Sequence, residues 1–193
     1  MKKTLLLIAI LFATLSCKTG TPVSGEVFVV TNGDGIYKPG AAPVSILRRK
    51  DLERRFSLLK SSLLKTLGEL DRGLDACLDS VSRVSESRQE PFARQCRAAN
   101  ESDFGVKLRK VIDDEIEILA TTRTNSEGQF TLILPENGDF VIISQALRTA
   151  GDFEEIYFFY HPMTVDGNPV SEVVSNLSIL DIERFRSLLA ELE

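Results

Sequence analysis

The residues of this chain best suited to acid–base or nucleophilic chemistry include a single histidine, His161. One histidine cannot build a multi-histidine zinc site, and it leaves only one general base for a Ser-His-Asp triad. Asp166 follows closely in the sequence, but no serine stands in the context of a nucleophile elbow. We therefore interpret His161 as an imidazole at the edge of a turn and expect no catalytic residue.

Other site chemistries are also poorly represented. Asn32-Gly33-Asp34-Gly35 combines oxygen ligands with glycines, as calcium loops do, but lacks the further acids and the terminal glutamate of a complete site. We interpret it as a hairpin turn. The sequence shows no glycine-rich phosphate loop, no Cys-x-x-Cys and no recognisable pair of catalytic carboxylates. We expect neither enzyme activity nor a bound metal or cofactor.

Two of the three cysteines, Cys77 and Cys96, lie on apolar helical stripes. An antiparallel helix pair folded about residues 86 and 87 would place them opposite one another. In an exported protein this arrangement favours a disulfide. Two buried thiols are the alternative, because metal binding by two cysteines without a nearby histidine is disfavoured.

The third cysteine, Cys17, follows an export signal. Met1-Lys2-Lys3 is basic, and the uncharged segment from Thr4 to Leu15 is too short to cross a bilayer as a stable helix. Ala13-Thr14-Leu15-Ser16-Cys17 resembles a bacterial lipobox, with threonine where leucine is usual. We expect residues 1–16 to be a lipoprotein signal peptide and Cys17 to be lipidated and tethered through residues 17–22.

The alternative at the N-terminus is an ordinary signal peptide cut nearby, which would leave Cys17 as a free secreted thiol. With lipidation, the protein would be exported and anchored to the bacterial cell envelope, and we expect the outer membrane. Removing Lys2 and Lys3 changes the net charge from −5 to −7. An acidic mature chain argues against nucleic acid as a partner.

The elements that position Cys77 and Cys96 form a predicted helical insertion, residues 50–116. Apolar residues recur there at three- and four-residue steps, which predicts one long amphipathic helix. They are Leu52, Phe56, Leu59, Leu63, Leu67, Leu70, Leu74, Cys77 and Val81. Pro91 suits the first turn of a second helix carrying Phe92, Cys96 and Ala99. A third amphipathic stretch through Phe104 and Leu108 would begin near Ser102.

Alternation of apolar residues predicts strands on both sides of the insertion. Phe130, Leu132 and Leu134 alternate, as do Phe140 and Ile142, and we interpret the two strands as a hairpin. Gly128 and Gly138 stand where tight turns favour a positive φ. Further strands are expected at 153–160 and 172–180, followed by a helix that Asp181 can cap. Apolar runs such as Val141 to Ile143 predict a sheet covered on both faces, with the insertion as the cover.

The segment around that predicted hairpin resembles the carboxypeptidase-regulatory-like domains, which are transthyretin-like (prealbumin-like) β-sandwiches. The resemblance rests on Thr124, Asn125, Gly128, Phe130, Leu132, Gly138 and Phe140, and on segments 23–29 and 40–47 as the first two strands. It implies a Greek-key sandwich of about seven strands, formed by residues 23–49 and 117–180. The helical hairpin would be inserted between its second and third strands, and residues 181–193 would form a C-terminal helix.

These features predict a mainly β protein with an α insertion. We expect a membrane-anchored envelope lipoprotein that acts as a non-catalytic interaction or structural module and contacts an envelope protein through the insertion. The lipoprotein of type VI secretion is similar in outline, so an accessory role in a secretion machine is one alternative. The other is a module that binds carbohydrate or another surface ligand, with Tyr157 and Tyr160 as stacking residues, although the chain has no tryptophan.

Overall fold

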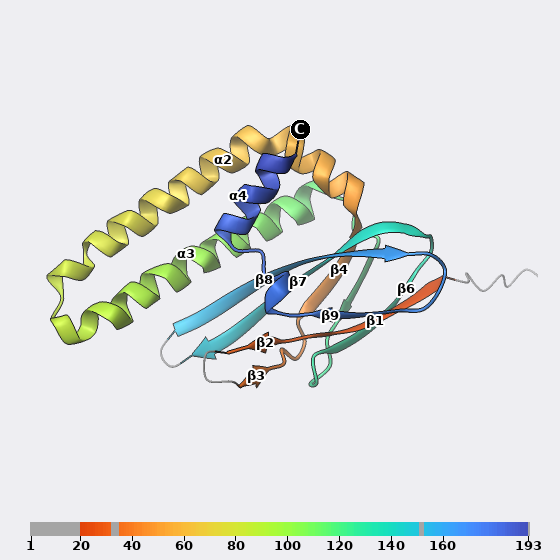
Figure 1. Ribbon diagram of the computed structural model, residues 1–193, viewed down its shortest axis with the longest axis horizontal. Helices are drawn as coiled ribbons and strands as arrows, with labels where there is room; N and C mark the ends of the chain where they lie inside the picture. Colours follow the sequence, from red (N-terminus) through yellow and green to blue (C-terminus); the bar gives the residue numbers. More distant parts are fainter. Residues whose placement is uncertain (1–19, 32–34, 151–152, 193) are drawn as a thin grey trace, which may run out of the picture.

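A computed structural model describes residues 20–31, 35–150 and 153–192 (Figure 1). Two sheets with strand orders β6-β1-β9 and β5-β4-β7-β8 are accompanied by a two-stranded ribbon, β2-β3. The strands are β1 (Thr21–Val27), β2 (Val29–Val30), β3 (Ile36–Tyr37), β4 (Pro43–Arg48), β5 (Ala120–Arg123), β6 (Gln129–Leu134), β7 (Gly138–Ala150), β8 (Phe153–Val165) and β9 (Val170–Val174). The helices are α2 (Arg49–Asp79), α3 (Glu86–Glu115) and α4 (Ile182–Glu191), with short 3₁₀ turns η1 (Val81–Arg83) and η2 (Asn176–Ser178).

The three-stranded and four-stranded sheets enclose a common apolar core. Alternate residues of β6, among them Phe130 and Leu134, pack in one buried cluster with Ile46, Phe140 and Ile142 of the four-stranded sheet. Strand side chains point alternately to the two faces of a sheet, so the period-two pattern predicted this core correctly. The chain is a two-layered β structure interrupted by a helical insertion, as the sequence predicts, but the insertion follows β4 and not the second strand, because the short β2–β3 ribbon was not expected.

The predicted hairpin of residues 129–143 is wrong. β6 pairs with β1, whereas β7 pairs with β4 and β8, so the link Pro135 to Asn137 crosses from one sheet to the other. Alternation tells which side chains are buried but not whether two successive strands share a sheet, because both sheets face the same core. The long hairpin in this fold is instead β7–β8, paired from Gly138–Val165 to Ala150–Phe153.

The motif residues before β6 form a tightly hydrogen-bonded turn. The Asn125 side-chain oxygen accepts bonds from the backbone N–H groups of Glu127 and Gln129, both at 2.9 Å. The Thr124 hydroxyl is buried; it accepts from Ala42 N at 2.9 Å and donates to the Pro39 carbonyl at 2.5 Å. Gly128 and Gly138 have φ angles of 73° and 148°, as expected for these turns.

The other face of the four-stranded sheet is covered by the three helices. Leu47, Val141, Ile143 and Phe158 of the sheet form a second buried cluster with residues of all three helices. These helical residues are Leu52, Phe56, Leu63, Leu67 and Leu70 of α2, Phe104, Leu108 and Ile112 of α3, and Ile182, Phe185 and Leu189 of α4. The prediction that the insertion covers the sheet is confirmed, and so is the docking of the C-terminal helix on the body.

The second half of the insertion differs from its prediction. One helix, α3, runs from Glu86 to Glu115, although separate helices beginning near Pro91 and Ser102 were expected. Pro91 is the sixth residue of the helix, where it cannot donate to the Ser87 carbonyl and its ring crowds that carbonyl, yet the helix continues through it. Ser102 lies inside the helix, between the buried residues Cys96 and Phe104.

Two further boundaries depart from expectation. β8 extends to Val165, and β9 ends at Val174 rather than continuing to residue 180. The chain turns there because the Asn176 side chain bonds both backbone groups of Val30, accepting from N at 2.7 Å and donating to O at 2.9 Å. α4 then begins after Asp181, which accepts the backbone N–H of Arg184 at 2.8 Å as the predicted cap.

Candidate functional site

The paired helices α2 and α3 extend well beyond the β-layers as an arm (Figure 1). Leu70 and Phe104 are the last members of the helical core on the two helices in the direction of the tip. From residue 71 to residue 103, a segment we call the distal arm, Cys96 is the only buried residue. The insertion is therefore divided: its base is part of the core, and its distal arm is surface.

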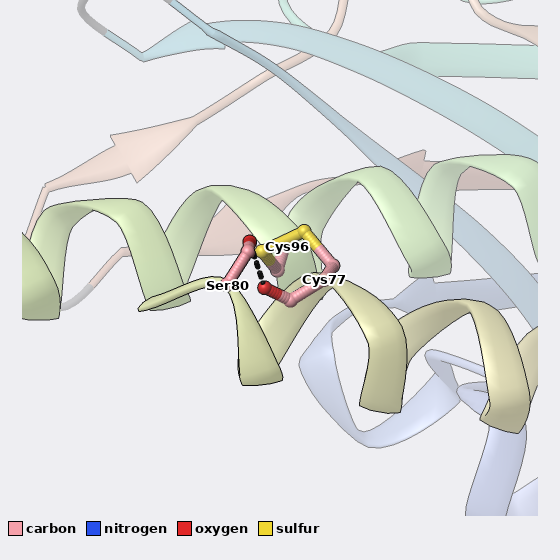
Figure 2. Close-up of a disulfide and its surroundings, with 3 residues drawn as sticks. All are labelled: Cys77, Ser80 and Cys96. Atoms are coloured by element: carbon pink, nitrogen blue, oxygen red, sulfur yellow. Dashed lines mark hydrogen bonds between the residues drawn. A yellow bond between two sulfur atoms is a disulfide. The ribbon is translucent and has the colours of Figure 1, made fainter. Parts of the chain in front are cut away.

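A disulfide joins the two helices of the distal arm. Cys77 of α2 and Cys96 of α3 are bonded, with their Cα atoms 5.9 Å apart. Figure 2 shows the bridge next to the end of α2, where the Ser80 hydroxyl donates to the Cys77 carbonyl at 2.5 Å. The antiparallel geometry that the sequence predicts thus places these cysteines together. The bridge fixes the α2–η1–α3 turn where the rest of the molecule provides almost no packing.

The basic residues of the distal arm are all arginines: Arg72, Arg83, Arg88, Arg94 and Arg97. Arg94 and Arg97 both approach Glu90, at 3.6 and 3.5 Å, and all three side chains are more than half exposed. Exposed ion pairs of this kind contribute about 0.5 kcal/mol or less to a helix. These guanidinium groups therefore add little to stability while remaining available to solvent.

Two clefts run along the seam between α2 and α3. One of about 410 Å³ is floored by apolar residues including Leu63, Leu108 and Phe185. The other, of about 190 Å³, extends to Cys77 and Cys96. Glu69 and Lys107 line both clefts, so the two clefts are neighbours along the seam.

His161 lies within β8, opposite Ile142 of β7, and not at the edge of a turn as expected. Its Nε2 is 2.9 Å from a Glu172 carboxylate oxygen, and its Nδ1 is 2.8 Å from the Ser178 hydroxyl. A carboxylate can only accept, so Nε2 donates to Glu172 in this arrangement, and in a neutral imidazole Nδ1 then accepts from the Ser178 hydroxyl. The order of groups resembles a Ser-His-acid relay that the sequence did not reveal.

These three side chains connect separate elements of the fold. Ser178 is buried, and it lines neither the two clefts along the α2–α3 seam nor the cleft beside β8. The three side chains come from β8, β9 and η2, and they link the segment after β9 to the four-stranded sheet. Leu180 adds a backbone bond to the Phe158 carbonyl at 2.8 Å in the same region.

The surroundings of Glu101 raise the pKa of its carboxyl well above the ordinary value. It lies on α3 at the base of the distal arm, where its carboxylate accepts a backbone hydrogen bond from Ile182 at the start of α4. Burial and, to a smaller extent, the nearby charges of Asp181 and Glu183 raise the pKa of Glu101 to about 7, against the opposing effect of the Ile182 N–H. Glu101 could not be recognised from the sequence, because its neighbours Asp181 and Glu183 are about eighty residues away in the chain.

The two tyrosines expected to stack on a sugar do not form one platform. Tyr157 packs with the core between the sheets, whereas Tyr160 packs with the helical core. Residues three apart on a strand point to opposite faces, and β8 contains both residues. Their side chains therefore cannot contact the same ring of a ligand.

Several predicted features lie outside the described residues: the signal peptide, the lipidation site Cys17 and residues 32–34 of the glycine-rich turn. That turn is flanked by β2 and β3, which pair antiparallel as a hairpin requires. Within the described chain, no group of three or more His, Cys, Asp or Glu residues is placed to hold a metal ion. No described helix has the length and apolar character needed to cross a membrane.

Comparison with known proteins identifies no family for this chain. No family model and no curated protein matches its sequence. Among solved structures, a proposed carbohydrate-binding protein of Pseudomonas aeruginosa aligns with a TM-score of 0.45 and 10% identity, over 86% of this chain and 94% of its own. The shaft pilin SpaA of Lactobacillus rhamnosus GG aligns with a TM-score of 0.34 and 12% identity, over 82% of this chain and 50% of its own.

A pilus backbone protein of Streptococcus pneumoniae aligns with a TM-score of 0.30 and 8% identity, over 80% of this chain and 40% of its own. This chain thus spans half or less of the two pilus proteins. At these scores the similarity assigns neither a common fold nor a function, so the functional argument rests on the chain's own residues.

Proposed function

We propose that this protein is a lipid-anchored envelope protein that binds another envelope protein through its distal arm and has no catalytic activity. The proposal rests on two properties of the distal arm, its small contact with the body and its disulfide. Residues 71–103 contact the body only at their base, where Asp71 bonds Arg186 of α4 and Ala98 and Glu101 line a cleft with β8, yet the Cys77–Cys96 disulfide crosslinks the two helices beyond that base. A rigid segment that the core does not need is best explained by contact with something outside the molecule.

The shape of the molecule supports this use. β1 starts at one end of the longest axis, and the turn between α2 and α3 lies at the opposite end (Figure 1). With Cys17 lipidated, residues 17–22 at about 3.5 Å each would keep the β-layers within roughly 20 Å of the bilayer. The distal arm would then extend away from the anchor, toward partners at some distance from the membrane surface.

The surface chemistry of the arm fits a protein partner. Arginine is enriched at protein interfaces, where its planar guanidinium makes paired bonds to carboxylates, and a preordered helix pays little ordering cost on binding. Arg83 and Arg88 lie beside the turn at the tip. The β-layers, with the transthyretin-like motif around Thr124 and Asn125, serve in this proposal as the scaffold that carries the arm.

Site-specific crosslinking in intact cells tests the proposal. A photoreactive residue is placed at Arg88 near the tip and, in a matched variant, at Thr131 on the exposed face of β6. We expect a discrete adduct from position 88 and none from position 131. In a third variant, residues 74–99 are replaced by a short Gly/Ser turn, and membranes are probed for the same partner by co-purification. Retention of the partner by this variant, or an adduct from position 131 alone, would contradict the proposal.

A further inference from the structure

We propose that the outer edge of β8, together with the cleft beside it, binds an extended peptide segment of a partner protein that carries a lysine or an arginine. The segment adds a strand to the four-stranded sheet next to residues 154–157. This contact lies at the base of the distal arm and not at its tip. It therefore goes beyond the contact proposed above and does not depend on it.

β8 is the last strand of its sheet, and part of its outer edge is already bonded. The backbone N–H of Leu180 donates to the Phe158 carbonyl at 2.8 Å, and Ile179 forms an antiparallel bridge with Phe159. The chain then leaves the edge, because Asp181 caps α4. The edge thus accepts an extended segment as far as Phe158 and is left open from residue 157 toward residue 153.

The open part of the edge carries unpaired backbone groups. Along a strand, the N–H and C=O groups of alternate residues point to the same edge. Since the Phe158 carbonyl points outward, the backbone groups of Ile156 and Glu154 point outward as well. No backbone partner for these outward groups is found within residues 20–31, 35–150 and 153–192. Such a row of free donors and acceptors is the surface to which an extended peptide bonds as an added strand.

A cleft of about 300 Å³ borders this open edge. It is lined by Ile156 and Phe158 of β8, by Ala98 and Phe104 of α3, and by the segment leading into α4. Phe158 belongs to the helical core, so the side chains at 156 and 158 face the helices. A partner residue directly opposite Ile156 points to the same face of the sheet and enters the cleft.

The charged residues that line this cleft are all acidic: Glu101, Glu155 and Asp181. Glu155 is engaged by Arg148 at 3.2 Å, and Asp181 is engaged as the cap of α4. Glu101 has no basic ion-pair partner in the described part of the chain. A lysine or arginine that enters the cleft from the added strand supplies this missing cation, and its stem packs against the apolar lining.

The same charges disfavour a second copy of this chain as the occupant. Two copies paired along their β8 edges would bring Glu154 and Glu155 of one copy close to those of the other, and like charges across a strand pair are destabilising. Charged side chains on an exposed edge prevent indiscriminate strand pairing. Here they leave the edge selective for a basic segment, so the partner is a different protein.

Two short synthetic peptides test the proposal. Both alternate threonine and valine, and they differ only in the central residue, which is lysine or glutamate. Binding to the disulfide-bonded protein is followed by fluorescence anisotropy at pH 8, above the raised pKa of Glu101. We expect the lysine peptide to bind roughly tenfold more tightly or better. It should also protect the backbone N–H groups of Glu154 and Ile156 from hydrogen exchange measured by NMR.

Two variants separate the added strand from the charge. Glu154→Pro removes an outward N–H without removing a bond between β7 and β8, and should weaken the lysine peptide by roughly tenfold. Glu101→Gln removes the unpaired charge and should remove most of the preference for lysine over glutamate. Glu90→Gln, on the exposed surface of the same helix, is the matched control and should keep the wild-type preference.

Four results would overturn the proposal. They are equal binding of the two peptides, binding without protection at residues 154 and 156, binding of neither peptide, and self-association of the protein that protects the same two N–H groups. The last would assign the edge to a second copy. The experiment uses neither the tip of the arm nor a cellular partner, so its result is independent of crosslinking from position 88.

Discussion

Residue 128 must be glycine for two separate reasons. Its φ is 73°, and a Cβ placed there would lie 2.4 Å from the Val27 carbonyl oxygen. Gly128→Ala should therefore lower the free energy of unfolding by about 2 kcal/mol or more, combining backbone strain with a collision. Gly73→Ala is the matched control: it lies in α2 with nothing within 4 Å of the new Cβ, and should stabilise by about 0.5–1 kcal/mol. Urea unfolding compares them, and equal effects would contradict the assignment of the turn.

Residues whose role is local could be recognised from the sequence, and those whose partners are distant could not. Gly128 and Asn125 act within a five-residue turn, so their pattern predicted their geometry. The hydrogen bonds of His161 could not be predicted, because its partners Glu172 and Ser178 lie on β9 and η2 and approach it only in the folded chain. Glu101 was missed for the same reason. The partner of a polar side chain cannot be identified from a single sequence when that partner lies on an element far away in the chain.

At the scale of elements, the arm depends on its disulfide. The bridge closes a loop with a sequence separation of 19 residues, which should contribute roughly 3 kcal/mol if the constraint acts on the unfolded chain. In the folded, unreduced protein both cysteines should resist alkylation and react only after a reductant is added. Rapid labelling without a reductant would contradict the bridge.

The double variant Cys77→Ser, Cys96→Ser tests whether the disulfide stabilises only the arm or the whole molecule. Because the distal arm buries almost nothing else, hydrogen exchange should accelerate mainly between the two cysteines. Protection of β7 and β8 should change little if the core folds independently of the tip. Equal losses in the arm and the sheet would mean that the disulfide stabilises the whole molecule.

The periodicity of apolar residues predicted whether a segment is a helix or a strand better than it predicted which strands pair with one another. Every buried residue of α2 belongs to the predicted stripe, because a helix keeps one face toward its core over many turns. The other predicted members, Leu59, Leu74, Cys77 and Val81, are only partly buried, and Val81 lies beyond the helix. In α3 the sequence wrongly predicted new helices beginning near Pro91 and Ser102, whereas a single helix continues through both residues. It also joined β6 to β7 as a hairpin, since both strands point their apolar residues into one shared core.

At the scale of the whole molecule, the anchor determines where the arm works. We expect Cys17→Ala to release the protein from membranes into the soluble envelope fraction or to block its processing, because no acyl chains would be attached. Fractionation followed by immunoblotting measures this. Unchanged membrane retention in Cys17→Ala would contradict lipidation as the anchor.

The last prediction concerns how much of the insertion the fold requires. An insertion could in principle be removed cheaply, since the entropy of closing a loop grows only logarithmically with its length. Here, however, Leu52, Phe56 and Leu108 are buried against Leu47 and other apolar residues of the sheet. Replacing residues 50–116 by a Gly/Ser linker would expose that face, and burial of each such side chain is worth about 1.5–3 kcal/mol.

The two deletions should therefore behave differently. The variant lacking residues 50–116 should aggregate or unfold without a cooperative transition. The variant lacking only residues 74–99 keeps Leu70, Glu101 and Phe104, and should melt cooperatively within a few degrees of the wild type, because the removed segment includes one buried residue, Cys96. Calorimetry on both variants decides the matter. A stable sheet without residues 50–116 would show that the helices are dispensable, and collapse without residues 74–99 would show that the distal arm belongs to the core.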